Sequence, residues 1–126
     1  LASDTYRPDP SGFMTAGVNK ALAYINENLT DDFAETDLAE VANMTASAFS
    51  RSFRKHTGMG VVEYVNRLRI NLACQMLMNA GAKTVTEICF ATGFNNLSNF
   101  NRQFLRQKGM NPSRFRALLE ENLKAA

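Results

Sequence analysis

Apolar residues recur along this chain at the three- and four-residue spacing of buried helix faces, and no segment alternates convincingly as a β-strand would. Phe49 and Phe53, for example, stand one helical turn apart and are followed by a helix-stopping Gly58. Thr84 and Glu87 have the spacing of a capping box. The pattern predicts seven helices, at about residues 15–28, 37–43, 46–57, 60–79 and 97–108, with two more that start after Thr84 and at Pro112.

Two of these helices are near copies of each other. The segment FSRSFRKHTGMG, which starts at Phe49, returns as FNRQFLRQKGMN, which starts at Phe100. The shared residues lie 51 positions apart, whereas the short helices before them correspond at a displacement of 50, so the second turn holds one extra residue. A short helix, a tight turn and a second helix with a basic exposed face describe a helix-turn-helix unit, which this chain contains twice.

The same pattern divides the chain into four segments. Residues 1–14 contain prolines and no helical periodicity, which predicts a linker or a disordered arm. Residues 15–59 and 81–126 each hold one helix-turn-helix subdomain, and residues 60–80 predict a long connecting helix. A helix of about 20 residues spans roughly 30 Å, close to the ~34 Å between successive major grooves on one side of B-DNA. The predicted fold is therefore all-α, with two helix-turn-helix subdomains joined by a linker helix.

The net charge of +2 conceals a strong segregation of charge along the chain. Residues 27–40 hold six acids and no base, residues 41–62 hold three bases and no acid, and residues 88–119 hold five bases and no acid. Because the acid-free stretches coincide with the two copies of the repeat, the charge pattern favours a polyanionic partner. The alternative is a helical interaction module that binds an acidic protein.

Residues suited to catalysis or metal binding are few. His56 is the one histidine and is predicted at a helix end, while Asp31-Asp32 is predicted as a solvated loop. Cys74 and Cys89 fall inside helical patterns, which indicates small core residues rather than a disulfide or metal pair. No apolar run approaches the ~20 residues that span a bilayer. We expect a cytoplasmic protein with no enzyme activity, cofactor, metal site or membrane segment.

The two Phe pairs, Phe49 with Phe53 and Phe100 with Phe104, define the buried side of each repeated helix and therefore its exposed side. The residue types on the exposed side are suited to the edges of bases in a major groove. Arg can pair with guanine O6 and N7, Asn with adenine N6 and N7, and hydroxyls with bases or phosphates. The exposed sets are Ala46, Ser47, Ser50, Arg51 and Arg54 in the first copy, and Leu97, Ser98, Asn101 and Arg102 in the second, where the pattern leaves the position of Asn99 open.

Many motif positions occur in order along both copies. They include Leu38-Ala39, Met44-Thr45, Phe49-Ser50-Arg51 and Phe53-Arg54-Lys55 in the first copy, and Glu87-Ile88, Gly93-Phe94, Ser98, Phe100, Arg102, Phe104, Pro112, Phe115 and Arg116 in the second. In these residues, the chain from about Leu38 to Arg116 resembles the AraC/XylS-type DNA-binding domain of bacterial transcription regulators. The resemblance implies sequence-specific binding of double-stranded DNA, with helices 46–57 and 97–108 reading adjacent major grooves.

The resemblance also implies roles for single residues and for partners. The departures from the family pattern are Gly60 for a capping Ser, Asn99 for a frequent aromatic and Leu105 for a usual Lys. The family implies RNA polymerase as a partner and a sensor domain N-terminal to Leu1, for which the chain's opening on Leu rather than Met leaves room. The base-reading positions fall on Ser47, Ser50, Arg51, Leu97, Ser98, Asn101 and Arg102, and the phosphate-side positions on Arg54, Lys55 and Arg106.

Overall fold

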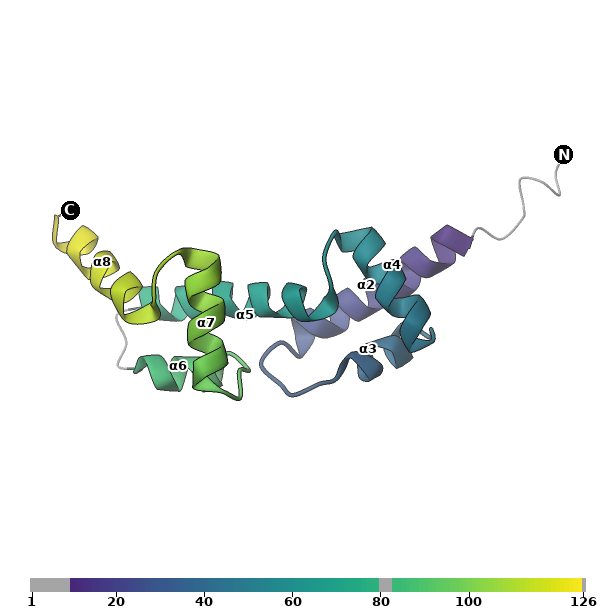
Figure 1. Cartoon of the computed structure of the whole chain (residues 1–126), viewed down its shortest axis with the longest axis horizontal. Helices are drawn as coiled ribbons and strands as arrows, with labels where there is room; N and C mark the ends of the chain where they lie inside the picture. Colours follow the sequence, from purple (N-terminus) through teal and green to yellow (C-terminus); the bar gives the residue numbers. More distant parts are fainter. Residues whose placement is uncertain (1–9, 80–82, 126) are drawn as a thin grey trace, which may run out of the picture. The chain divides into compact units, whose positions relative to one another are not determined.

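The computed structural model of the chain describes residues 10–79 and 83–125. Within them the chain forms seven α-helices and no strand, so the all-α prediction is confirmed (Figure 1). None of these helices is long and apolar enough to cross a bilayer. The described residues divide into two compact units, of which the first holds residues 10–28 and 33–64, and the second holds residues 29–32, 65–79 and 83–125.

The first unit is a packed set of three helices and the start of a fourth. Helix α2 (Pro10–Glu27) packs against both α3 (Glu35–Val41) and α4 (Ala46–Thr57), and α3 packs against α4 (Figure 1). One ring pair, Phe53 and Tyr64, meets edge-on with centroids 5.3 Å apart and joins α4 to the following helix. The buried core residues are Val18, Ala21, Ile25, Leu38, Ala39, Ala42, Phe49, Phe53 and Val61.

The N-terminal boundary of α2 corrects the predicted arm. The sequence pattern predicts an arm over residues 1–14, whereas α2 already begins at Pro10. Proline suits the first turn of a helix because the N–H groups there have no acceptor within the helix. Residues 10–14 are therefore helical, and residues 1–9 lie outside the described residues.

Helix α3 also begins earlier than the sequence pattern predicts, at Glu35 rather than at about residue 37. Thr36 has the side chain of a typical N-cap, yet the N-cap is Ala34. The Ala34 N–H donates to Asp37 Oδ2 at 2.8 Å, so an acid three residues inside the helix satisfies the orphan donor. The helix start depends here on an N3 side chain, which a search for an N-cap hydroxyl does not find.

The two tight turns share a left-handed residue at corresponding positions. Asn43 has φ +56°, and Gly93, which stands 50 residues later, has φ +104°. Asparagine and glycine are the residues that enter this region at the lowest cost. The repeat seen in the sequence is thus a repeat of backbone conformation at the turn.

The second unit is built on most of α5 (Val61–Met78), together with α6 (Val85–Ala91), α7 (Leu97–Lys108) and α8 (Pro112–Ala125). As predicted, α6 begins after the Thr84 capping box and α8 begins at Pro112, where Asn111 Oδ1 accepts from the Arg114 N–H. Three residues of the predicted connecting helix, Ile70, Ala73 and Leu77, are buried in this unit. The core of the second unit consists of Ile70, Ala73, Leu77, Ile88, Cys89, Phe94, Phe100 and Phe104.

Arg69 of α5 holds the loop over residues 29–32 within the second unit. Its Nε donates to Leu29 O and its Nη2 to Asp31 O, each at 2.9 Å. Partial burial lowers the pKa of Arg69, and nearby Asp32 opposes that shift. A Cβ at Gly93 would lie 2.7 Å from Arg69 Nε, so this turn needs glycine for space as well as for its φ.

Both cysteines belong to the core of the second unit, as their positions in the helical pattern predict. Cys89 is buried, Cys74 packs against the same cluster, and both are free thiols. Burial raises the pKa of each thiol, and Lys108 partly opposes this for Cys74. Both side chains are therefore protonated at neutral pH and act as small apolar core residues.

Candidate nucleic-acid interface

Helix α4 presents one face to its core and the opposite face to solvent. Thr45 Oγ1 caps its first turn by accepting from the Ala48 N–H at 3.2 Å, and Gly58 ends it with φ +82°. Phe49 and Phe53 are fully buried. The bounds Ala46–Thr57 equal the predicted ones because both terminal signals are local to the sequence.

Helix α7 repeats this construction in the second unit. Asn96 Oδ1 accepts from the Asn99 N–H at 2.8 Å, and Gly109 ends the helix with φ +76°. Phe100 and Phe104 are fully buried and pack with Phe94 and Phe115 on either side. The two helices therefore expose equivalent positions.

The predicted base-reading residues of α4 lie together on its exposed face. Ser47, Ser50 and Arg51 are all exposed. Arg51 Nη1 donates to Ser47 Oγ at 2.9 Å, so the guanidinium lies back along the helix over the preceding turn. Arg51 uses one of its five N–H donors in this bond, which leaves four for a ligand.

Of the predicted base-reading residues of α7, three are exposed and one is not. Ser98, Asn101 and Arg102 are exposed, whereas Leu97 is half-buried and packs against the core of the second unit. Arg102 Nη2 donates to Asn99 Oδ1 at 2.8 Å. The sequence pattern left the role of Asn99 open. The sequence feature that could have drawn attention to this residue is its difference from Ala48, which occupies the corresponding position of α4.

The three predicted phosphate-side residues, Arg54, Lys55 and Arg106, are exposed near the C-terminal ends of the two helices. Arg54 folds over the turn after α4, since a Cβ at Gly60 would lie 3.0 Å from its Nη2. Leu105 takes the place of Arg54 in α7 and is 54% exposed. At this position α7 therefore lacks the basic side chain that α4 has, although the last turn of each helix holds two lysines or arginines, Arg54 and Lys55 in α4 and Arg106 and Lys108 in α7.

The acids of the helix-turn-helix units lie on the first helix of each turn rather than on α4 or α7. Glu35, Asp37 and Glu40 are exposed on α3, and Glu87 is exposed on α6. Neither α4 nor α7 contains an acid. The exposed faces of these two helices thus carry positive charge and no negative charge that would repel an anion.

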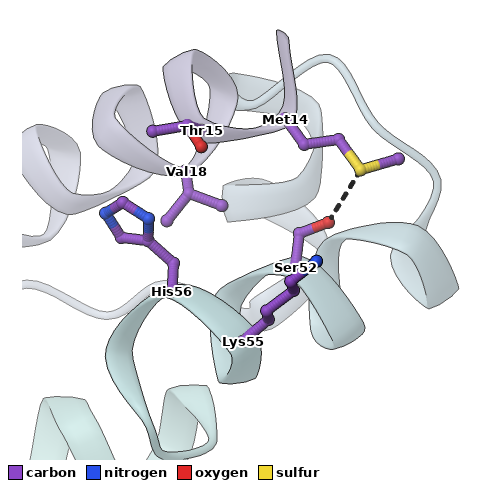
Figure 2. A pocket seen from close by; sticks show the side chains of 6 residues that line it. All are labelled: Met14, Thr15, Val18, Ser52, Lys55 and His56. Carbon is purple, nitrogen blue, oxygen red and sulfur yellow. Dashed lines mark hydrogen bonds between the residues drawn. The ribbon is translucent and has the colours of Figure 1, made fainter. Parts of the chain in front are cut away.

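A pocket of about 260 Å³ lies beside α4 on the side that faces α2 (Figure 2). Ser52 Oγ donates to Met14 Sδ at 3.4 Å across it. The sequence pattern did not predict this pocket, although two of its lining residues, Met14 and Val18, stand one helical turn apart on α2. The lining residues are Met14, Thr15, Val18, Ser52, Lys55 and His56.

Known proteins with similar sequences also contain helix-turn-helix domains. A family model described as a helix-turn-helix domain matches residues 38–118. An HTH-type transcriptional regulator of Bacillus subtilis, YobQ, is 35% identical over 82% of this chain and 43% of its own length. Other relatives are named transcriptional activators or regulatory proteins. The chain spans less than half the length of these relatives.

Solved structures share the fold. The DNA-binding domain of AdpA, determined in complex with a target DNA, superposes with a TM-score of 0.78 at 27% identity over 84% of this chain and 95% of that one. An AraC-type regulator from Chromobacterium violaceum superposes with a TM-score of 0.74 at 22% identity over 83% of this chain and 93% of that one. The chain belongs to the AraC-type helix-turn-helix family of DNA-binding domains of transcription regulators.

Proposed function

We propose that this chain binds double-stranded DNA sequence-specifically as the DNA-binding part of a bacterial transcription regulator. The observation that carries the proposal is the repeated construction of α4 and α7, in which a fully buried Phe pair sets an acid-free face of Arg, Ser and Asn toward solvent. An α-helix fits the major groove, and these side chains match the hydrogen-bonding groups displayed there.

The residue roles follow from exposure and from position on each helix. Arg51 and Arg102 are the principal base readers, each with donors left over for guanine O6 and N7. The basic residues toward the helix ends neutralise phosphates, which adds affinity without sequence preference. The proposed base readers are Ser47, Ser50, Arg51, Leu97, Ser98, Asn101 and Arg102, and the proposed phosphate contacts are Arg54, Lys55 and Arg106.

The half-buried position of Leu97 narrows the role that we assign to it. A side chain that packs against the core offers DNA only part of its apolar surface. Leu97 is therefore proposed to touch at most a thymine methyl group, the one apolar feature of the major groove.

The proposal extends to the organisation of the chain. Subdomains over residues 15–59 and 81–126 each supply one recognition helix, and residues 60–80 join them. The α5 helix within that join has 18 residues, or about 27 Å at 1.5 Å per residue, which suits recognition of adjacent major grooves. In the complete protein we propose a sensor domain N-terminal to Leu1, contact with RNA polymerase, and a cytoplasmic location where bacterial DNA is found.

Selection of bound DNA from a random pool tests the function directly. We expect a two-part motif whose centres lie about one helical turn apart. Selection that yields no enriched motif would contradict sequence-specific binding. Failure to retain any duplex DNA, combined with retention of acidic proteins, would favour the helical protein-interaction module instead.

A further inference from the structure

The two principal arginines of the proposed interface are held by different neighbours. In α4, Arg51 Nη1 donates to Ser47 Oγ, four residues back, at 2.9 Å. In α7, Arg102 Nη2 donates to Asn99 Oδ1, three residues back, at 2.8 Å. The residues three and four back from a helical position flank it on the previous turn, so the two guanidinium groups lie in different directions on otherwise equivalent faces.

One difference between the repeats accounts for this. Long helical side chains fold back over the turn that precedes them, where they can reach an acceptor three or four residues away. In α4 the residue three back from Arg51 is Ala48, so Ser47 is the side-chain acceptor within reach. In α7 both Ser98 and Asn99 offer an acceptor, and Arg102 binds Asn99.

Asn99 is itself fixed in place. Its backbone N–H donates to Asn96 Oδ1 at 2.8 Å as part of the helix cap, and its side chain is half-buried. Gln103 Nε2 donates to Asn99 Oδ1 at 3.5 Å, the same oxygen that accepts from Arg102. The Asn99 side chain therefore offers Arg102 an acceptor in the first turn of the helix that can orient the guanidinium before any ligand arrives.

We propose that Asn99 is a specificity-determining residue that acts through Arg102 by setting the direction in which the guanidinium meets the base pairs. This inference rests on the proposed DNA-binding function. Holding the side chain in advance removes the conformational cost of ordering it on binding. Because Arg102 donates to Asn99, this bond does not use the Ser98 hydroxyl, whereas the equivalent hydroxyl of Ser47 accepts from Arg51.

The test uses the DNA motif selected by the wild-type chain and its single-base variants. We expect Asn99→Ala to reduce discrimination by about 3- to 10-fold at the base pair whose preference Arg102→Ala relaxes, which corresponds to ordering one long side chain. The double variant should lose no more than Arg102→Ala alone, because Asn99 acts only through that arginine. Losses that add, or unchanged discrimination in Asn99→Ala, would overturn the inference.

A conservative variant separates positioning from stability. Asn99→Asp keeps an acceptor at the same atom, so it should retain discrimination while weakening binding to every sequence through its negative charge. Loss of discrimination in this variant would contradict a positioning role. Thermal denaturation should show no loss of stability in either variant, since the cap donor is the backbone N–H, which every residue at this position except proline retains.

Helix α4 offers a matched control, because Ala48→Asn gives it the acceptor that α7 has. We expect the preference at the Arg51 base pair to change and the half of the motif read by α7 to stay the same. No change at the Arg51 base pair would count against the inference. If Arg102→Ala itself had no effect on any base pair, the proposed function would fail at its second reader, which is a distinct result.

Discussion

At the scale of single residues, Arg51 and Arg102 are the side chains for which the proposed interface makes its sharpest prediction. Both are exposed, and both keep donors free beyond their bonds to Ser47 and Asn99. We expect Arg51→Ala or Arg102→Ala to cost about 1–3 kcal/mol on the selected motif and to relax preference at one base pair each. Titration of each variant against the motif and its single-base variants measures both quantities.

Lys124→Ala provides the control for this experiment, because it removes one positive charge from the exposed end of α8. It should change affinity little and base preference not at all. A uniform loss across all sequences in the Arg51 and Arg102 variants would assign these residues to phosphates rather than bases.

The phosphate-side residues predict a different signature, one of salt dependence. Lys55→Ala should weaken binding to all sequences alike and reduce the slope of log K against log salt by about one unit. Leu105→Lys should steepen the slope by about one unit, and the 54% exposure of Leu105 means that little core packing is lost. Equilibrium binding measured over a series of salt concentrations gives both slopes. An unchanged slope in Lys55→Ala would remove this residue from the interface.

At the scale of elements, the parts of the fold that the sequence predicts well are those with local signals. Helices α4 and α7 have a capping residue at one end and a glycine at the other, and their predicted bounds match the structure. The start of α2 was predicted too late because Pro10 reads as a breaker as readily as a first-turn residue. Boundaries without a dedicated side chain cannot be read with the same accuracy.

The site shows the same division. The exposure of Ser98 and Arg102 follows from the spacing of the Phe pair alone. Which acceptor each arginine takes depends on side-chain rotamers, and the pocket beside α4 depends on how closely α2 approaches it. Neither property has a periodic signal in the sequence, so both required the three-dimensional structure.

The capping box of α6 gives a prediction for pH. Thr84 donates its backbone N–H to Glu87 Oε1, and Glu87 donates its own to Thr84 Oγ1, each at 3.1 Å. Because the bond from the Thr84 backbone N–H favours the carboxylate, the pKa of Glu87 is lower in the folded chain than its usual value. The carboxylate therefore stabilises the fold above its unfolded-state pKa, and this stability is lost as pH falls through the lower folded-state pKa.

We expect Glu87→Gln to lower the melting temperature at neutral pH. The melting temperatures of the variant and the wild type should converge as the pH falls below the usual pKa range of glutamate. Glu121→Gln, which changes an exposed acid of α8, is the control. Thermal denaturation followed by circular dichroism between neutral and acid pH measures the difference. A gap between wild type and Glu87→Gln that widens toward acid pH would contradict the assignment of the cap.

At the scale of the whole molecule, each compact unit carries its own core and its own recognition helix. The fully buried Phe49 and Phe53 belong to the first unit and Phe100 and Phe104 to the second. The two units thus share the same buried framework and differ at exposed positions. Ser50 and Arg54 of the first repeat correspond in sequence to Asn101 and Leu105 of the second. A duplicated framework with unlike readers suits an asymmetric DNA site better than a palindrome.

The covalent join between the units predicts that the two halves of such a site must keep their spacing. Helix α5 is continuous from Val61 to Met78 and contributes residues to both units. Inserting about 5 base pairs between the halves of the selected motif turns the second half to the opposite side of the duplex. We expect this insertion to reduce affinity to that of a motif whose second half has been scrambled. Band-shift titration of the spaced and the scrambled duplexes measures both affinities. An insertion that leaves the affinity unchanged would contradict the prediction, because it would mean that one unit supplies the binding energy or that the helix between the units bends freely.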